Sequence, residues 1–239
     1  RMTDPALIWS YLTREPLLWL TATLIAYWLG ASFFQRMGRQ SWANPVLVAV
    51  IILAVLLWIT GTSYQTYFEG AKFVHFMLGP ATVALGMPLY DNLRRVRQAA
   101  LPLIAALLAG SVTAVVSVLL IARAFGLPQV MMASMAPKST TAPVAIGIAE
   151  RLGGEPTIAA VLVLLTGVFG AIIATPLLNA LGIRDWRARG FSLGVAAHGI
   201  GTARAFQVNE TAGAFAGIGM GLNAVLTAII APLILHLFG

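Results

Sequence analysis

Two short polar stretches, set within long apolar segments, contain the residues of this chain that are best suited to bind a ligand or to transfer a proton. The first, APKSTTAP at 136–143, places Lys138 and three neighbouring hydroxyl residues between two prolines. Lys138 is the only charged residue between Arg123 and Glu150, and an ionisable group in an apolar segment is a candidate functional group. A helix that begins after the break would point free N–H groups and its positive dipole end at an anion. This stretch predicts part of an anion site, with capping hydroxyls, made by Lys138, Ser139, Thr140 and Thr141.

The second stretch, HGIGTAR at 198–204, combines His198, Thr202 and Arg204 with two glycines. The forked guanidinium of arginine suits a carboxylate, and glycines let a ligand approach the backbone closely. Histidine titrates near neutral pH, so we expect His198 to bind substrate and to couple protons. The three side chains share a helical face only if the helix continues through the glycines.

Each stretch also has a purely structural explanation. Lys138 can extend to the membrane interface while the hydroxyls satisfy a kinked backbone. His198 can be a hydrogen-bonded contact between helices, and Arg204 can pair with Glu210. Two weaker candidates complete the predicted substrate site: Thr82, in the Gly/Pro-rich stretch 79–86, and Asn223, which can equally be a helix–helix hydrogen bond.

Composition indicates the surroundings of these residues. The chain is 59% hydrophobic and only 10% charged, with mean hydropathy +0.87, whereas soluble domains average about 25% charged residues. We therefore expect an all-α, polytopic integral membrane protein in a lipid bilayer. Its net charge of +7 reflects arginines in three short loops, the pattern of cytoplasmic loops, so we expect no nucleic-acid partner. The first residue is arginine, so we expect a trimmed start, and no cleavable signal peptide is readable.

Several kinds of site have no signature in the sequence. Nucleotide-binding glycine motifs and zinc spacings do not occur, and with no cysteine there are no disulfides. With 3 histidines and 8 acidic residues, mostly in loops, we expect neither an enzyme nor a bound metal or cofactor.

Apolar segments of two kinds position the candidate residues. We expect about seven to eight membrane segments in one transporter-like domain, 1–239. Its N-terminal spans occupy 17–72, with an interfacial loop at 62–72, and a core of broken helices occupies 73–239. Continuous spans are expected at 17–35, 45–61, 98–122, 156–183 and 211–238. Segments broken by glycine or proline, discontinuous or re-entrant, are expected at 73–90, 129–150 and 190–207. Asn44 should cap the second span, with Pro45 in its first turn.

Charge and repetition constrain the topology. If all three basic loops face the cytoplasm, segment 129–150 makes no net crossing and is re-entrant. A weak internal repeat also appears, since AIIA at 171–174 recurs 57 residues later at 228–231. At that offset Pro80 maps to Pro137, which conflicts with treating 73–90 as a crossing segment and 129–150 as re-entrant.

The sequence resembles the LrgB/CidB family of bacterial inner-membrane proteins from about residue 17 to the end. The resemblance rests on PKSTTAPVAIGIAERLGG, LTGVFGAIIATPLLNALGI and RGFSLGVAAHGIGTARAFQVNE. Gly199 stands where the family usually has alanine, and Ala142 precedes Pro143 where the family usually has Thr-Thr-Pro.

This resemblance implies two functions. Some relatives are treated as carriers of small monocarboxylates such as pyruvate, glycolate and glycerate, including a relative in the plastid envelope. This agrees with an anion site between broken helices. The alternative is a holin-like or antiholin-like regulator of murein hydrolase export and autolysis. An LrgA/CidA-type small membrane protein is the expected partner, and glycine-rich faces suggest a homodimer.

Overall fold

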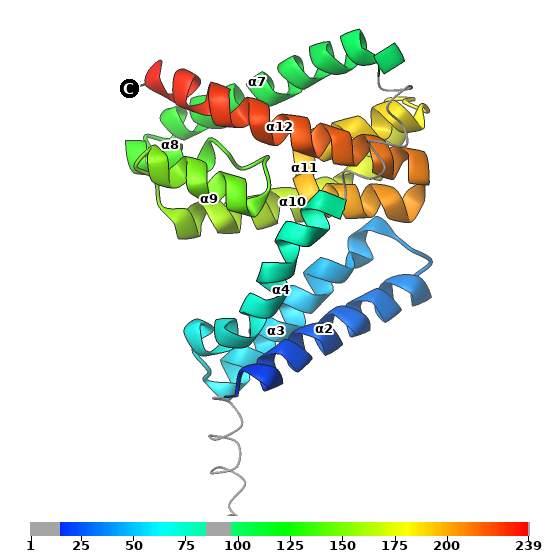
Figure 1. The fold of residues 1–239 in the computed structure, drawn as a ribbon, viewed down its shortest axis with the longest axis vertical. Helices are drawn as coiled ribbons and strands as arrows, with labels where there is room; N and C mark the ends of the chain where they lie inside the picture. Colours follow the sequence, from blue (N-terminus) through cyan, green and yellow to red (C-terminus); the bar gives the residue numbers. More distant parts are fainter. Residues whose placement is uncertain (1–14, 85–96, 239) are drawn as a thin grey trace, which may run out of the picture. The chain divides into compact units, whose positions relative to one another are not determined.

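The computed structural model describes residues 15–84 and 97–238, which contain helices and turns but no strand (Figure 1). The all-α prediction is therefore confirmed for these residues. The chain divides into two compact units, residues 1–84 and 85–239, and each is described by itself.

The first unit contains α2 (Pro16–Arg36), the short 3-10 helix η1 (Ser41–Ala43), α3 (Pro45–Thr60) and α4 (Tyr64–Ala84). The predicted cap of α3 is confirmed. Asn44 Oδ1 accepts hydrogen bonds from the backbone N–H groups of Val46, at 2.9 Å, and Leu47, at 3.2 Å. Pro45 occupies the first turn, where no N–H group is needed.

The predicted interfacial loop at 62–72 is wrong, because most of it forms the first turns of α4. Ser63 Oγ accepts the Thr66 N–H at 3.2 Å and so starts the helix. Tyr67 then packs edge-on against the buried Trp19 of α2. Gly70 packs against the Pro16 carbonyl so closely that a Cβ atom would not fit. The polar and aromatic residues therefore form a helix face that packs on α2. The predicted break at Gly79-Pro80 is also wrong, because α4 continues through Pro80; Pro88 lies outside the described residues.

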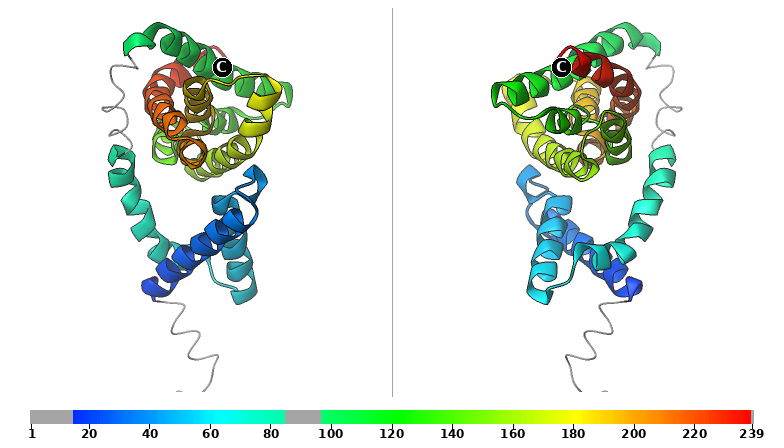
Figure 2. Two further views of the ribbon diagram at one scale, coloured as in Figure 1. Left: turned by 90° about the vertical axis from the view of Figure 1, so that its right-hand side faces the viewer. Right: turned by 90° about the vertical axis from the view of Figure 1, so that its left-hand side faces the viewer.

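The second unit carries the predicted polar stretches. It comprises α7 (Ala100–Ala124), α8 (Gln129–Met135), α9 (Ala142–Arg151), α10 (Pro156–Ala180), α11 (Trp186–Val208) and α12 (Glu210–His236). Figure 2 shows several of these helices nearly end-on, packed as a bundle.

Four helices in the described residues are long and apolar enough to cross a membrane: α2, α7, α10 and α12. The chain therefore has the composition and helices of a membrane protein, while the total of seven to eight segments stays a prediction. Helices α7 and α12 run in the same direction. Leu103 clusters with Phe215 near their starts, and Ala122 clusters with Leu235 near their ends.

Helices α8 and α9 form a hairpin beside α7. Met132 and Ala133 of α8 and Ile148 of α9 share one core cluster with Ala122 and Leu235, at the C-terminal ends of α7 and α12 (Figure 1). The connections before α8 and after α9 therefore lie at that same end of the unit. Between the two helices, residues 136–140 form turns and a bend, and Thr141 is extended.

The α11 range contains a second hairpin. Ala197 and His198 have non-helical torsions, with φ +41° at His198, and they separate an arm of residues 186–196 from one of 199–208. A Cβ on Gly201 would lie 2.7 Å from the Leu193 carbonyl oxygen. Leu193 also clusters with Ala205, so the second arm folds back along the first.

Close packing of α12 against the first arm of α11 depends on residues without side chains. A Cβ on Gly194 would collide with the Ala216 carbonyl, and one on Gly219 would lie 2.6 Å from the Phe191 carbonyl oxygen. Gly190 makes the same approach to Ala212. Such contacts let helix backbones approach within van der Waals distance, which drives helix association in membranes.

We predict that Gly194→Ala lowers the free energy of unfolding of the detergent-solubilised protein by about 1–3 kcal/mol, and with it the unfolding temperature. The added methyl group must separate α11 from α12. Gly221→Ala, on α12 but facing open space, is the matched control and should be neutral or stabilising by about 0.5–1 kcal/mol. Thermal unfolding followed by size-exclusion chromatography measures both. Equal stability of the two variants would contradict this packing.

Candidate functional site

The tip of the α8–α9 hairpin is held in the middle of the bundle by Asn223. This residue lies near the centre of α12 and is fully buried. Its Nδ2 donates to the Ser139 carbonyl at 3.1 Å, and its Oδ1 accepts from Ser111 Oγ of α7 at 2.6 Å and from Thr227 Oγ1 at 3.1 Å. Ser111 is itself central in α7, so two long helices fix the tip midway along their lengths.

The Ser139 hydroxyl stands apart in this network. The residue is 1% exposed, yet its Oγ has no hydrogen-bond partner among the described residues. Neighbouring Thr140 is satisfied locally, because its Oγ1 donates to the Pro137 carbonyl at 2.9 Å. Burying a hydroxyl without a partner costs about 1–3 kcal/mol, so Ser139 is a candidate ligand-binding group.

The α11 tip carries His198. The Val163 carbonyl of α10 lies 2.9 Å from His198 Nε2, and because a carbonyl only accepts, Nε2 carries the hydrogen. Thr202 Oγ1 donates to the His198 carbonyl at 2.8 Å. His198 thus makes the helix–helix hydrogen bond that was one of its two predicted roles.

The two tips meet the same part of α12. Thr202 Oγ1 lies 3.9 Å from Met220 Sδ, and Met220 precedes Asn223 by three residues, about 4.5 Å of helix rise. The second helix of each hairpin begins at its tip: α9 after Thr141, and the second arm of α11 after His198. Two helix N-termini therefore start near the level of Asn223.

The remaining predicted residues are placed less centrally or not at all. Lys138 is partly buried in the first tip. Thr141 precedes α9, but the predicted capping is wrong because its side chain makes no cap hydrogen bond; the Ala145 N–H bonds the Thr141 carbonyl instead. Arg204 is buried and lines a small cavity with Thr175 and Trp186, a cavity without residues of the first hairpin. The Thr82 side chain lies outside the described residues.

Sequence reasoning missed three partners in this region. Ser111 and Thr227 lie in segments predicted as continuous spans and were not selected as candidates, although each is a polar residue deep in an apolar helix. That placement is itself a usable signal, since buried polar groups in membranes need partners. The Val163 carbonyl had no signal, because a backbone acceptor can be recognised only from the packed structure.

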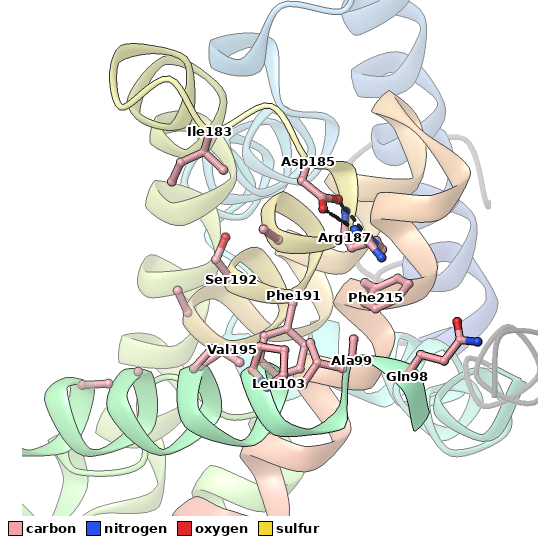
Figure 3. Close-up of a pocket in the computed structure, with 16 residues that line it drawn as sticks. Gln98, Ala99, Leu103, Ile183, Asp185, Arg187, Phe191, Ser192, Val195 and Phe215 are labelled. Atoms are coloured by element: carbon pink, nitrogen blue, oxygen red, sulfur yellow. Dashed lines mark hydrogen bonds and ion pairs between the residues drawn. The ribbon is translucent and has the colours of Figure 1, made fainter. Parts of the chain in front are cut away.

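A cavity of about 730 Å³ in the second unit lies elsewhere. Figure 3 shows it between α7 and the first arm of α11, lined mainly by apolar and small side chains such as Leu103, Phe191 and Val195. At its rim, Arg187 hydrogen-bonds the Asp185 carboxylate and thereby holds the pKa of that carboxyl below its usual range. The cavity contains none of the predicted site residues, so we place the candidate site at the hairpin tips.

No group of three or more His, Cys, Asp or Glu side chains suited to a metal ion occurs in the part of the chain that is described. The polar groups at the tips are hydroxyls, an amide, an imidazole and an ammonium group. Such a set suits a small anion better than a hard cation.

Comparisons with known proteins agree with these motifs. The chain is 31% identical to the "Holin-like protein CidB" of Staphylococcus epidermidis, over 94% of this chain and 97% of that one. It is equally similar to the CidB of Staphylococcus aureus. It is 37% identical to the "Uncharacterized protein YxaC" of Bacillus subtilis, over 90% of this chain and 94% of that one. No solved structure matches.

The match to the LrgB-like family runs over residues 23–237, which include both hairpins and all three long helices of the second unit. The resemblance inferred from the sequence motifs is confirmed. The chain belongs to the LrgB-like family.

Proposed function

We propose that this protein carries small monocarboxylates, of the pyruvate, glycolate and glycerate class, through a site between the two hairpin tips. The observation that carries the proposal is the buried Ser139 hydroxyl, which lacks a partner among the described residues and lies beside the start of α9. A bound carboxylate would supply the missing acceptor.

Electrostatics at the tips favour an anion. The N-termini of α9 and of the second α11 arm each contribute about half a positive charge and free N–H groups. Lys138, next to Ser139, adds a full positive charge in a partly buried position. Apolar surroundings strengthen such attractions, and half-helices pointing at a central anion are a recurring transporter arrangement.

The other predicted residues take distinct roles. Asn223 and Thr140 hold the first tip, while Thr141 and Thr202 flank the helix starts. His198 couples protons through Nδ1, since its Nε2 is engaged by Val163. Arg204 lies six residues beyond His198, about 9 Å along the arm, and attracts the anion on its way to the site. Thr82 stays a sequence prediction.

The hairpins are re-entrant in this proposal. An arm of ten residues rises about 15 Å, half of the roughly 30 Å hydrocarbon core, so the tips reach the membrane centre. The end of the second unit where α7 and α11 begin is the cytoplasmic side in this proposal, because more arginines lie there. That end has Arg97, Arg184, Arg187 and Arg189, and the other end has Arg123 and Arg151. In a bacterium this is the inner membrane.

A second candidate is favoured by the name of the CidB relatives, "Holin-like protein". In this alternative the chain regulates murein hydrolase export and autolysis, together with an LrgA/CidA-type small membrane protein. A homodimer through glycine-rich faces fits either candidate. A holin-like pore needs no specific hydroxyl at mid-membrane, so the two candidates differ in what Ser139→Ala does.

In proteoliposomes containing this chain alone, we predict saturable uptake of labelled pyruvate or glycolate. Ser139→Ala should lower uptake at least about tenfold, because a hydrogen bond to a charged group contributes about 1.5–3 kcal/mol. The same substitution should leave thermal stability unchanged or raised, since it removes a buried hydroxyl without a partner in the described residues. Lys138→Ala and Arg204→Lys should also lose uptake.

Ser117→Ala, on the exposed face of α7, is the control and should transport normally. Normal uptake by Ser139→Ala would remove that hydroxyl from the site. No uptake of any small acid by the parent chain, with or without a pH gradient, would favour the partner-dependent or holin-like candidate.

The chain has no native cysteine, so single-cysteine variants report topology directly. We predict that cysteines replacing Gln129 and Glu150, at the two ends of the first hairpin, react with a membrane-impermeant maleimide from one side. Cysteines replacing Arg184 and Glu210 should react only from the opposite side. All four parent residues are exposed, so labelling of oriented vesicles measures sidedness. Labelling of positions 129 and 150 from opposite sides would mean that α8 and α9 cross the membrane.

A further inference from the structure

The two hairpins occupy equivalent positions in a repeat. The first extends from the start of α8 at 129 to the end of α9 at 151, and α11 starts and ends 57 residues later, at 186 and 208. The AIIA sequence of α10 recurs in α12 at the same offset. The repeating unit is therefore a hairpin followed by a long helix: α8–α10, then α11–α12.

The hairpins of the two repeats enter the bundle of the second unit from opposite ends. The first hairpin packs with the C-terminal ends of α7 and α12, through Ala122 and Leu235. The first arm of α11 packs with their N-terminal halves, through Leu103 and Phe215. The long helix between the hairpins, α10, connects the two ends, so the repeats have inverted topology.

Each tip rests on the long helix of the other repeat, at matching positions. The first tip is hydrogen-bonded to Asn223 in α12, and Thr227, one turn further along α12, donates to the same Asn223 amide. The second tip rests on a gap in α10 formed by Gly167 and Gly170. A Cβ on Gly167 would lie 2.6 Å from His198 Cε1, and one on Gly170 would lie 2.5 Å from Ala197 Cβ. Gly170 and Thr227 are 57 residues apart, as the repeat requires.

We propose that Gly167 and Gly170 are positioning residues that form a seat for the α11 tip, and that this tip is the mobile gate of the central site. The role of the tip as a gate rests on the proposed carrier activity. The packing of the tip against Gly167 and Gly170 does not depend on that activity. The contact of the first tip with α12 and that of the second tip with α10 differ in strength. The first tip is tied to Asn223, which is itself held by Ser111 and Thr227.

The second tip has one side-chain hydrogen bond to α10, from His198 to the Val163 carbonyl, among the described residues. The rest of its contact with α10 is close packing against the glycine gap. Opening this contact frees one imidazole N–H, which lies on the moving tip, whereas releasing the first tip would leave the Asn223 amide of α12 without its partner.

Two single-cysteine reporters test the seat in the cysteine-free chain. Thr202→Cys reports the second tip and Ser139→Cys the first, and both parent residues are about 1% exposed. Each is combined with Gly167→Ala, whose methyl group would displace the His198 ring, or with the control Gly221→Ala, which faces open space. The measurement is the rate of alkylation by a membrane-impermeant maleimide in oriented vesicles.

We expect Gly167→Ala to raise labelling of Thr202→Cys about tenfold or more, only from the side where α11 begins, with Ser139→Cys still protected. Gly221→Ala should change neither rate. Unchanged labelling of Thr202→Cys, or increased labelling of both reporters, would overturn the proposal; Gly170→Ala provides a second test if Gly167→Ala does not fold. Because no substrate is involved, the result is independent of whether the protein transports monocarboxylates.

Discussion

The Asn223 amide supports the middle of the second unit. A chain can leave helical conformation in apolar surroundings only if its freed polar groups find partners, and Asn223 supplies one to the Ser139 carbonyl. Ser111 and Thr227 satisfy the other side of the amide, so the tip is joined to α7 and α12 at once. This arrangement holds the Ser139 hydroxyl in the interior without a partner in the described residues, which is the basis of the proposed site.

The second tip is organised by packing more than by hydrogen bonds. Its two arms fold together at Gly201, its first arm meets α12 at Gly194, and its tip meets α10 at Gly167 and Gly170. Each contact requires a missing Cβ. The glycines that weaken helices as isolated elements are what allow a hairpin of two short arms to fit between long helices. One tip is thus held by polar bonds and the other by close fit, and this difference lets us assign them different roles.

Much of the fold could be predicted from hydropathy and from the residues that start and interrupt helices. The long apolar helices lie within a few residues of their predicted positions, and Asn44 caps α3 as expected. The loop predicted at 62–72 failed because its aromatic residues form a helical face on Trp19, which local composition does not reveal. Capping by Thr141 failed because a side-chain cap is one of several ways to start a helix.

The polar residues within apolar segments, and the glycines and prolines that interrupt those segments, can be identified from the sequence alone. Those features were enough to predict an all-helical membrane protein and to select Lys138, Ser139 and His198. Which of these groups contact one another is visible only once the helices are packed. The pairing of Ser139 with Asn223, 84 residues away, and of His198 with a carbonyl 35 residues away, depends on how distant helices pack. Helical periodicity reports which face of one helix is buried, but not the partner that buries it.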